Sequence, residues 1–278
     1  MPKAQGRVVA LLAPLVVVGL VAVAGTGIYG LVTRNSAHDP ASVALPPPQP
    51  PLLPGAPKLA KPVPAALANV PPLGYDVSHP QCGRALPAGG GYAIVAVTGG
   101  RPLSSNKCSG QQLRWASGKP GHAVYLNTGY PGTGDPVGYG RRVVDDAVLR
   151  EHAAGSGGTA VWWLDVETVN TWSGTTQVNA TVLDAMAARL QDLGVRVGIY
   201  STPAMWAQIA GSWAPGLPVW YATGPGTERT ATAACSLGLA GSATAIVQWV
   251  QPGAGGALDH NLICPAYRSR AGELLDLR

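Results

Sequence analysis

The chain has 278 residues and a formal net charge of +5, which by itself would suit a nucleic-acid-binding protein. However, residues 73–278 hold 14 Lys and Arg against 13 Asp and Glu, so most of the excess lies before them. A nucleic-acid-binding protein carries its basic charge on the folded domain, so we predict no nucleic-acid partner. Residues 73–278 are enough for one well-buried domain of α/β-barrel size.

The chain opens with an apolar segment. Residues 8–32 are almost entirely apolar and follow the basic residues Lys3 and Arg7. As a helix they would measure roughly 37 Å, enough to anchor the chain in a bilayer with its basic end in the cytoplasm. The alternative is a signal peptide cleaved after the Ala-Val-Ala of residues 22–24. Residues 1–33 are thus predicted to be a signal anchor or a signal peptide. Both interpretations place the rest of the chain in the extracytoplasmic cell envelope, either membrane-anchored or secreted after cleavage.

A proline-rich stretch follows. Residues 34–72 contain runs such as Pro46-Pro47-Pro48, few charges and no helical period, so they cannot build a core. At about 3.1 Å per residue, the proline-studded part, residues 39–72, would reach roughly 100 Å. We predict a stiff linker over residues 34–72 that holds a folded domain, residues 73–278, within the cell-wall layer.

All four cysteines lie in the predicted domain: Cys82, Cys108, Cys235 and Cys264. An even number in an exported domain indicates two disulfides. Of the three possible pairings we favour Cys82–Cys108 and Cys235–Cys264, because each would join neighbouring strand and helix units. No Cys-x-x-Cys or His-x-x-x-His spacing occurs, so we predict no metal site.

Short β-rich runs alternate with helical segments after residue 72. The predicted strands are Leu73–Val77, Tyr92–Val97, Ala123–Asn127, Ala160–Asp165, Val195–Tyr200, Val219–Ala222 and Ala245–Val250. Helical spacing covers Tyr139–Ala154 and Gln177–Leu193. This order predicts an α/β fold, either a parallel barrel or a doubly wound sheet. Neither a Gly-x-Gly-x-x-Gly motif after the first strand nor a complete phosphate-binding loop occurs, so we predict no nucleotide cofactor.

Two carboxylates end the fourth predicted strand. Asp165 and Glu167 are two residues apart, so alternation along the strand places both on one side. Like charges in a partly desolvated site raise one pKa, and glycoside hydrolysis needs one neutral and one ionised carboxyl. The alternative is that both acids only cap the next helix, near Thr175. Because Asp76 and Asp259 also lie near strand ends, we favour catalysis.

Four motifs occur in a characteristic order. They are Asp-Val-Ser at residues 76–78, Leu-Asp-Val-Glu at 164–167, Gly-Ile-Tyr at 198–200, and Gln-Trp at 248–249 with Leu-Asp at 258–259. This set resembles glycoside hydrolase family 25, the Chalaropsis-type lysozymes, over residues 73 to about 265, and within it an exported actinobacterial branch.

The resemblance implies a single (β/α)5(β)3 barrel that cleaves the β-1,4 bond between N-acetylmuramic acid and N-acetylglucosamine with retention. It implies that Glu167 is the general acid. Asp165 would orient or stabilise the N-acetyl group of the substrate, or act as the nucleophile. Asp76 and Asp259 would be supporting carboxylates.

Polar and aromatic residues near strand ends are candidates for sugar binding. They are Tyr125, Asn127, Tyr200, Trp220 and Trp249. Aromatic residues of α/β domains often belong to the core, which is the alternative for each. The family's usual Tyr-His-Phe is replaced here by Tyr-Leu-Asn at residues 125–127, so the sugar-binding walls are expected to differ. Asp145, Asp146 and Glu151 are expected on a solvated helix face.

We therefore expect a monomeric, muramidase-like hydrolase that needs no cofactor and acts on peptidoglycan or a related cell-envelope glycan. A catalytically silent glycan-binding module and a cell-wall scaffold on the same barrel remain the alternatives.

Overall fold

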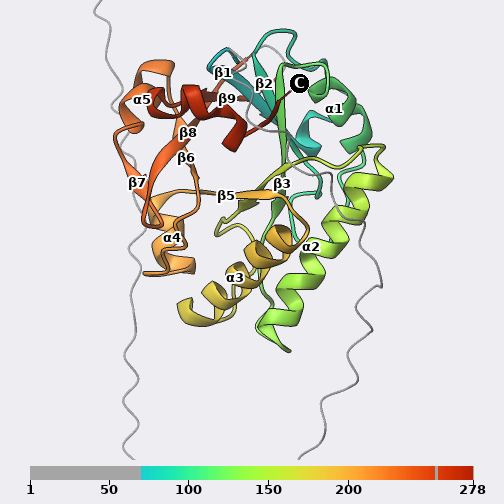
Figure 1. Ribbon diagram of the computed structural model, residues 1–278, viewed down its shortest axis with the longest axis vertical. Coiled ribbons are helices and arrows are strands. Elements are labelled where there is room, and N and C mark those ends of the chain that lie inside the picture. The colour runs from blue at the N-terminus through green and yellow to red at the C-terminus, as the bar shows by residue number, and fades with distance from the viewer. Residues whose placement is uncertain (1–69, 254–255, 278) are drawn as a thin grey trace, which may run out of the picture. The chain divides into compact units, whose positions relative to one another are not determined.

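The computed structural model describes residues 70–253 and 256–277 (Figure 1). The predicted membrane segment, residues 8–32, and residues 34–69 of the predicted linker lie outside this part of the chain. Within the described ranges, no helix is both long enough and apolar enough to cross a membrane.

Eight strands close into a barrel. Their order is β1-β2-β3-β4-β5-β6-β8-β9. Hydrogen bonds between β9 and β1 close the barrel. Every neighbouring pair is parallel except those of β9, which runs antiparallel to β8 and β1. The strands are β1 (Leu73–Val77), β2 (Tyr92–Ala96), β3 (Gly121–Asn127), β4 (Val161–Asp165), β5 (Arg196–Ser201), β6 (Val219–Pro225), β8 (Ser242–Gln251) and β9 (Leu258–Ile263). The predicted α/β barrel is confirmed, and so are its seven predicted strands, whereas β9 had been predicted only as a motif.

An α-helix follows each of the strands β2 to β6, whereas β1, β8 and β9 have none, as the five-plus-three arrangement implies. The helices are α1 (Ser109–Ala116), α2 (Pro136–Ala153), α3 (Thr176–Asp192), α4 (Pro203–Ile209) and α5 (Glu228–Ala234). The two predicted helices correspond to α2 and α3, which contact each other along one side of the barrel (Figure 1). The smaller elements are η1 (His79–Gln81), β7 (Gly238–Leu239), η2 (Pro265–Glu273) and β10 (Asp276–Leu277).

Local signals set the ends of the long helices. Asp135 caps α2 by accepting hydrogen bonds from the backbone N–H groups of residues 137 and 138. Thr175 caps α3, accepting from Val178 N, and Gly194 with φ +84° follows the end of that helix. Since Thr175 supplies the cap itself, Asp165 and Glu167 are not needed for that purpose.

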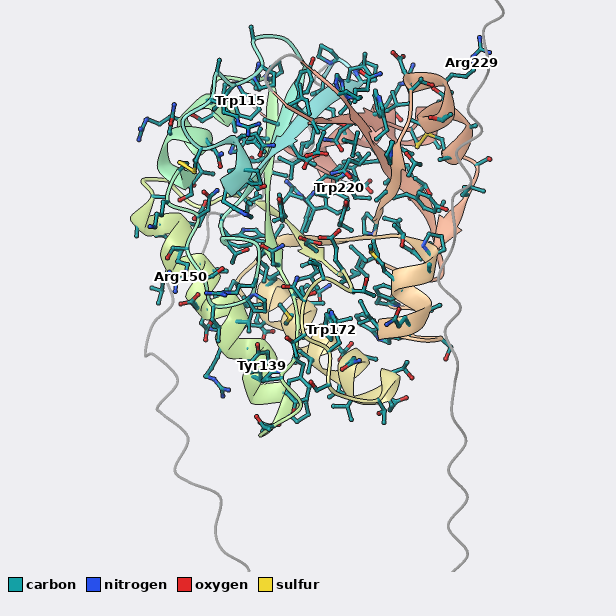
Figure 2. The ribbon with its side chains drawn as sticks, turned by 180° about the vertical axis from the view of Figure 1, so that it is seen from behind. Trp115, Tyr139, Arg150, Trp172, Trp220 and Arg229 are labelled. Atoms are coloured by element: carbon teal, nitrogen blue, oxygen red, sulfur yellow. A yellow bond between two sulfur atoms is a disulfide. The ribbon has the colours of Figure 1, made fainter. Side chains whose placement is uncertain are left out.

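The tryptophans of β4 separate two buried layers. Trp162 belongs to the cluster between the sheet and the helices, whereas Trp163 packs inside the barrel with Trp220. Gly198 is the register partner of Trp163, and a Cβ at this position would lie 2.2 Å from the indole ring. Only glycine leaves room for the large side chain on the neighbouring strand. Figure 2 shows Trp220 near the centre of the barrel.

The expectation of a solvated acidic face on α2 is wrong for two of its three residues. Asp145 is buried and accepts a hydrogen bond of 2.8 Å from Arg189 Nε of α3. Glu151 is also buried, and its Oε1 accepts from both the backbone N–H and the hydroxyl of Thr159. Only Asp146 remains partly exposed, in an ion pair with Arg150.

Both predicted disulfides are present. Cys82–Cys108 joins the turn after β1 to the start of α1, with Cα atoms 5.6 Å apart. Cys235–Cys264 joins the end of α5 to the end of β9, with Cα atoms 5.5 Å apart. Each bridge therefore ties together neighbouring parts of the barrel, which restricts the unfolded chain.

Candidate active site

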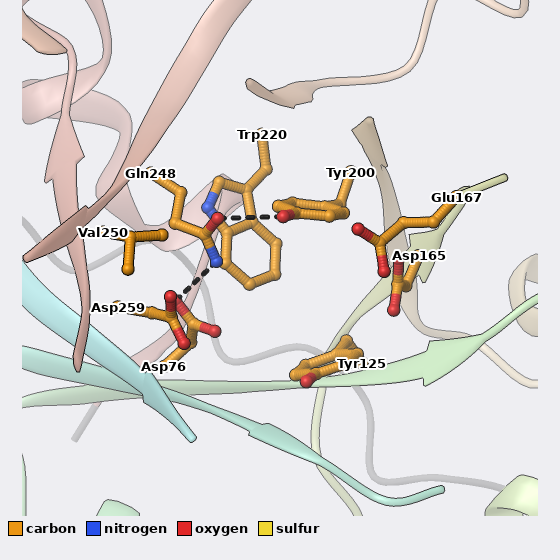
Figure 3. Close-up of a pocket in the computed structure, with 9 residues that line it drawn as sticks. All are labelled: Asp76, Tyr125, Asp165, Glu167, Tyr200, Trp220, Gln248, Val250 and Asp259. Carbon is orange, nitrogen blue, oxygen red and sulfur yellow. Dashed lines mark hydrogen bonds between the residues drawn. The ribbon is translucent and has the colours of Figure 1, made fainter. Parts of the chain in front are cut away.

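A cavity of about 230 Å³ lies at the end of the barrel where the parallel strands finish (Figure 3). Its lining consists of Asp76, Tyr125, Asp165, Glu167, Tyr200, Trp220, Gln248, Val250 and Asp259. All four predicted catalytic carboxyls therefore share one cavity. Figure 3 shows them as two pairs on opposite sides, Asp165 with Glu167 and Asp76 with Asp259.

The first pair belongs to β4 and the residues that follow it. Asp165 is 3% exposed, whereas Glu167 is only half-buried. Asn127 Nδ2 donates a hydrogen bond to Asp165 Oδ2. Thr98 fixes the orientation of that amide, because its Oγ1 accepts from Asn127 N at 2.9 Å and donates to Asn127 Oδ1 at 2.7 Å. The amide nitrogen of Asn127 is consequently the end that faces Asp165.

Burial and mutual repulsion favour a shared proton in this pair. Burial raises the pKa of Asp165 well above its ordinary value, and the neighbouring Glu167 raises it further. Burial also raises the pKa of Glu167. Asp165 Oδ1 is buried and receives no hydrogen bond from the described residues. A proton held between Asp165 and Glu167 would satisfy this oxygen, and the more exposed Glu167 is the group that a substrate would meet.

The second pair is held by side-chain amides. Asp76 and Asp259 are register partners on the antiparallel strands β1 and β9. Asp76 Oδ2 accepts hydrogen bonds from Gln248 Nε2 at 3.0 Å and from Asn261 Nδ2 at 2.7 Å. Burial and then the charge of Asp259 raise the pKa of Asp76, while the two amide donors lower it. Burial and then the charge of Glu167 raise the pKa of Asp259 to about 6.

Aromatic residues connect the two carboxyl pairs. Tyr200 donates from its hydroxyl to Gln248 Oε1 at 2.8 Å, and Trp220 Nε1 donates to Asn261 Oδ1 at 2.7 Å. The rings of Tyr200 and Trp220 pack edge to face with centroids 4.6 Å apart, and Tyr125 packs on Trp220 from another side. Burial raises the pKa of both tyrosines, so their hydroxyls stay neutral and able to donate.

Two predicted sugar-binding residues do not line the cavity. Trp249 is buried beneath α5, with its ring stacked on His260 at 5.2 Å. Alternation along β8 explains this position, because Gln248 faces the cavity and its neighbour must face outward. Asn127 is also buried, and its amide contacts Asp165 behind the cavity wall.

The sequence-based prediction missed Gln248, Asn261 and Val250 as site residues. Asn261 follows Asp259 at the same two-residue spacing that pointed to Asp165 and Glu167, so that signal could have identified it. In residues 70–253 and 256–277, no group of three or more His, Cys, Asp or Glu residues is arranged to hold a metal ion.

Comparisons of the sequence point to lysozymes. The family model described as "Lysozyme-like protein 1" (Lys-1) matches residues 156–236, which include β4. Probable GH family 25 lysozyme 4 of Dictyostelium discoideum is 32% identical over 68 residues, which cover 24% of this chain and 32% of that protein. The matching stretch therefore spans about a third of the length of this relative.

The fold is similar to those of solved structures. A family GH25 lysozyme from Aspergillus fumigatus superposes with a TM-score of 0.55 at 13% identity, covering 73% of this chain and 99% of the other. A muramidase from Acremonium alcalophilum superposes with a TM-score of 0.54 at 18% identity, covering 73% of this chain and 99% of the other. The chain is thus similar in sequence to lysozyme-like proteins around β4, and its barrel has the fold of family 25 lysozymes.

Proposed function

We propose that the chain is a glycoside hydrolase of family 25 that acts on peptidoglycan as a retaining muramidase. The observation that carries this proposal is the cavity with two carboxyl pairs, in which burial favours a proton on the Asp165–Glu167 pair. The relatives support the choice of substrate, since one is a probable family 25 lysozyme and one solved structure is a muramidase.

In the proposed reaction, Glu167 donates the shared proton to the glycosidic oxygen as the bond from this oxygen to the anomeric carbon breaks. The carbonyl oxygen of the substrate's N-acetyl group forms a bond to the anomeric carbon, giving an oxazolinium ion. The Asp165 carboxylate orients the N–H of this group and offsets its positive charge. Water then adds to the anomeric carbon, the oxazolinium opens, and the proton of the water returns to Glu167.

Asp165 could instead attack the anomeric carbon as the nucleophile, and retention would also follow. The opposite pair, Asp76 and Asp259, would bind sugar hydroxyls across the cavity, assisted by the neutral hydroxyls of Tyr125 and Tyr200. If Asp259 activated a water from that side, the product would have the inverted configuration.

The test uses the full chain, purified peptidoglycan, and Glu167→Gln as the comparison. Products are reduced with borohydride and identified by mass spectrometry, and NMR on fresh product gives the anomeric configuration. We expect soluble fragments with reduced muramic acid ends and retained configuration from the wild type, and almost none from Glu167→Gln. Reduced glucosamine ends would assign a different bond, and binding without any product would identify a silent glycan-binding module.

We also propose that the domain works in the cell envelope as a monomer from an exported actinobacterial branch. The two disulfides support an oxidising compartment. Anchoring through residues 8–32, or secretion after cleavage, rests on the apolar pattern of that segment. Separation of membrane and soluble fractions of producing cells, followed by immunoblotting and mass determination of the N-terminus, distinguishes the two.

A further inference from the structure

A second groove lies at the same end of the barrel as the catalytic cavity. It has a volume of about 360 Å³ and is lined by Gly100, Arg101, Pro102, Tyr130, Pro131, Tyr139, Val169, Asn170 and Thr171. These residues come from the loops that follow β2, β3 and β4, and from the first turn of α2. None of them lines the catalytic cavity.

The groove is joined to the catalytic acid by one short turn. Asn170 N donates to the backbone oxygen of Glu167 at 3.3 Å, and Trp172 Nε1 donates to the same oxygen at 3.0 Å. The segment from Glu167 to Thr171 therefore directs its first side chain into the cavity and its last residues into the groove. A substrate bound at Glu167 would have the groove immediately beside it.

Hydrogen bonds and close contacts between the loops form the groove without a ligand. Tyr130 N donates to Thr171 O at 2.7 Å, and Ser173 N donates back to Tyr130 O at 3.1 Å, so the loops after β3 and β4 are paired. A Cβ at Gly129 would lie 3.0 Å from Thr171 O and 3.2 Å from Pro102 Cγ, which shows how closely the three loops approach. A preformed groove avoids the entropic cost of ordering loops when a ligand binds.

Two polar side chains of the groove, those of Arg101 and Asn170, have unused hydrogen-bonding groups among the described residues. Arg101 is exposed, and no ion pair to it occurs among the described residues. Asn170 is 9% exposed, and its Nδ2 is buried without an acceptor in the described chain. By contrast, the hydroxyl of Tyr130 is engaged with Gly134 O at 2.7 Å. Among the described residues, the groove thus offers one cation without an ion pair and one amide nitrogen without an acceptor, and none of its lining residues is acidic.

The remaining surface is apolar and rigid. Pro102 and Pro131 belong to the lining together with the rings of Tyr130 and Tyr139, which pack edge to face with centroids 5.3 Å apart. Figure 2 labels Tyr139 on α2. Val169 is 79% exposed and extends the apolar surface of the groove. Small aliphatic side chains, amide groups and a carboxylate would fit such a lining better than a sugar ring.

We propose that this groove binds the short peptide that peptidoglycan carries on its lactyl group, with a peptide carboxylate at Arg101 and a peptide amide at Asn170. The inference rests on the proposed function and specifies its substrate: the enzyme would prefer glycan that bears peptide over bare glycan. The sugars would occupy the catalytic cavity while the peptide crosses the Glu167–Asn170 turn into the groove.

The test measures binding by calorimetry to the full chain carrying Glu167→Gln, which prevents turnover. Two ligands share one muramic-acid disaccharide; one bears a tripeptide and the other ends in a methyl amide on the lactyl group. We expect the peptide-bearing ligand to bind about tenfold more tightly, the range of one charge-assisted contact. Adding Arg101→Ala should remove this difference, whereas Arg141→Ala, an exposed arginine of α2 outside the groove, should keep it.

Asn170→Asp supplies a second variant that keeps the size of the side chain. Its negative charge should weaken the peptide-bearing ligand and leave the methyl amide ligand unchanged. Equal affinity for the two ligands, or an equal loss for both in Arg101→Ala, would overturn the peptide groove and leave the proposed hydrolase standing. Failure of both ligands to bind would overturn both.

Discussion

The two carboxyl pairs of the cavity are built alike but held differently. Each consists of a deeply buried aspartate, Asp76 or Asp165, and a more exposed acid, Asp259 or Glu167. The buried aspartate accepts from side-chain amides in both cases. Asp76 has two amide donors, and these are themselves fixed by a tyrosine and a tryptophan. Asp165 has a single amide donor, and its second oxygen receives none from the described residues.

In the proposed function, this difference explains why one pair would supply the proton and the other would bind the substrate. The two donors lower the pKa of Asp76 against the larger effect of burial, and they hold the side chain in place, which suits a residue that binds and orients. The pair on β4 is less fully satisfied, so a proton can reside between Asp165 and Glu167 and leave when a substrate oxygen approaches.

The largest expected effect contrasts the exposed acid of each pair. Glu167→Gln should lower the rate of peptidoglycan hydrolysis by about 10³, the contribution of a general acid, whereas Asp259→Asn should cost about tenfold. Reducing-end release from purified peptidoglycan measures both. Asp184→Asn, an exposed substitution on α3, is the control and should keep full activity. If Glu167→Gln and Asp259→Asn lose the same activity, the two carboxyl pairs do not have different roles.

A smaller effect concerns stability and pH. The folded protein binds the proton of Asp259 more tightly than the unfolded chain does, because its pKa rises from 3.8 to about 6. The stabilisation by this group is complete below its unfolded pKa and is lost as the pH rises through the folded value. We expect Asp259→Asn to raise the free energy of unfolding relative to wild type by up to about 2 kcal/mol more at pH 7.5 than at pH 4.

Chemical denaturation of both proteins at several pH values measures this difference. Asp184→Asn should follow the wild type throughout. A difference between Asp259→Asn and wild type that does not change with pH would show that Asp259 has an ordinary pKa in the folded protein.

The smallest effect tests the single amide on β4. Asn127→Leu removes the donor to Asp165, which should raise the pKa of the pair and move the alkaline limb of the pH-rate profile upward. The accompanying loss of rate should be about fivefold, the value of one hydrogen bond. Asn261→Leu removes a donor to Asp76 instead and should leave that limb in place. If the alkaline limb of the pH-rate profile moves equally in both variants, the two carboxyl pairs titrate together.

Much of the barrel could be predicted because its strands are continuous apolar runs between turn residues. Strand β9 differs, since it carries three polar residues in succession, Asp259 to Asn261, and so lacks the apolar signal. Asp259 lines the cavity, and Asn261 donates to Asp76. Helices α1, α4 and α5 have seven or eight residues, too few for a helical period to appear clearly. The missed strand thus carries site residues, and the missed α-helices are short.

The carboxyl residues of the site could be predicted from the sequence, but the residues that surround and hold them could not. Spacing alone put Asp165 beside Glu167, whereas the choice between Gln248 and Trp249 depends on which face of β8 points inward. The burial of Asp145 could not be predicted either, because its partner Arg189 lies 44 residues away on another helix. Positions that depend on register or on distant partners require the folded chain.

The role of Glu167 can be tested most directly with a substrate whose leaving group needs no proton. We compare peptidoglycan with a dinitrophenyl glycoside of the N-acetylated sugar in wild type, Glu167→Gln and Asp165→Asn. If Glu167 is the acid, Glu167→Gln should fail on peptidoglycan yet release the first equivalent of dinitrophenol within about tenfold of the wild-type rate, because only the later water step needs Glu167 as a base. Asp165→Asn should fail on both substrates. An equal loss on both substrates in Glu167→Gln would contradict proton donation by Glu167.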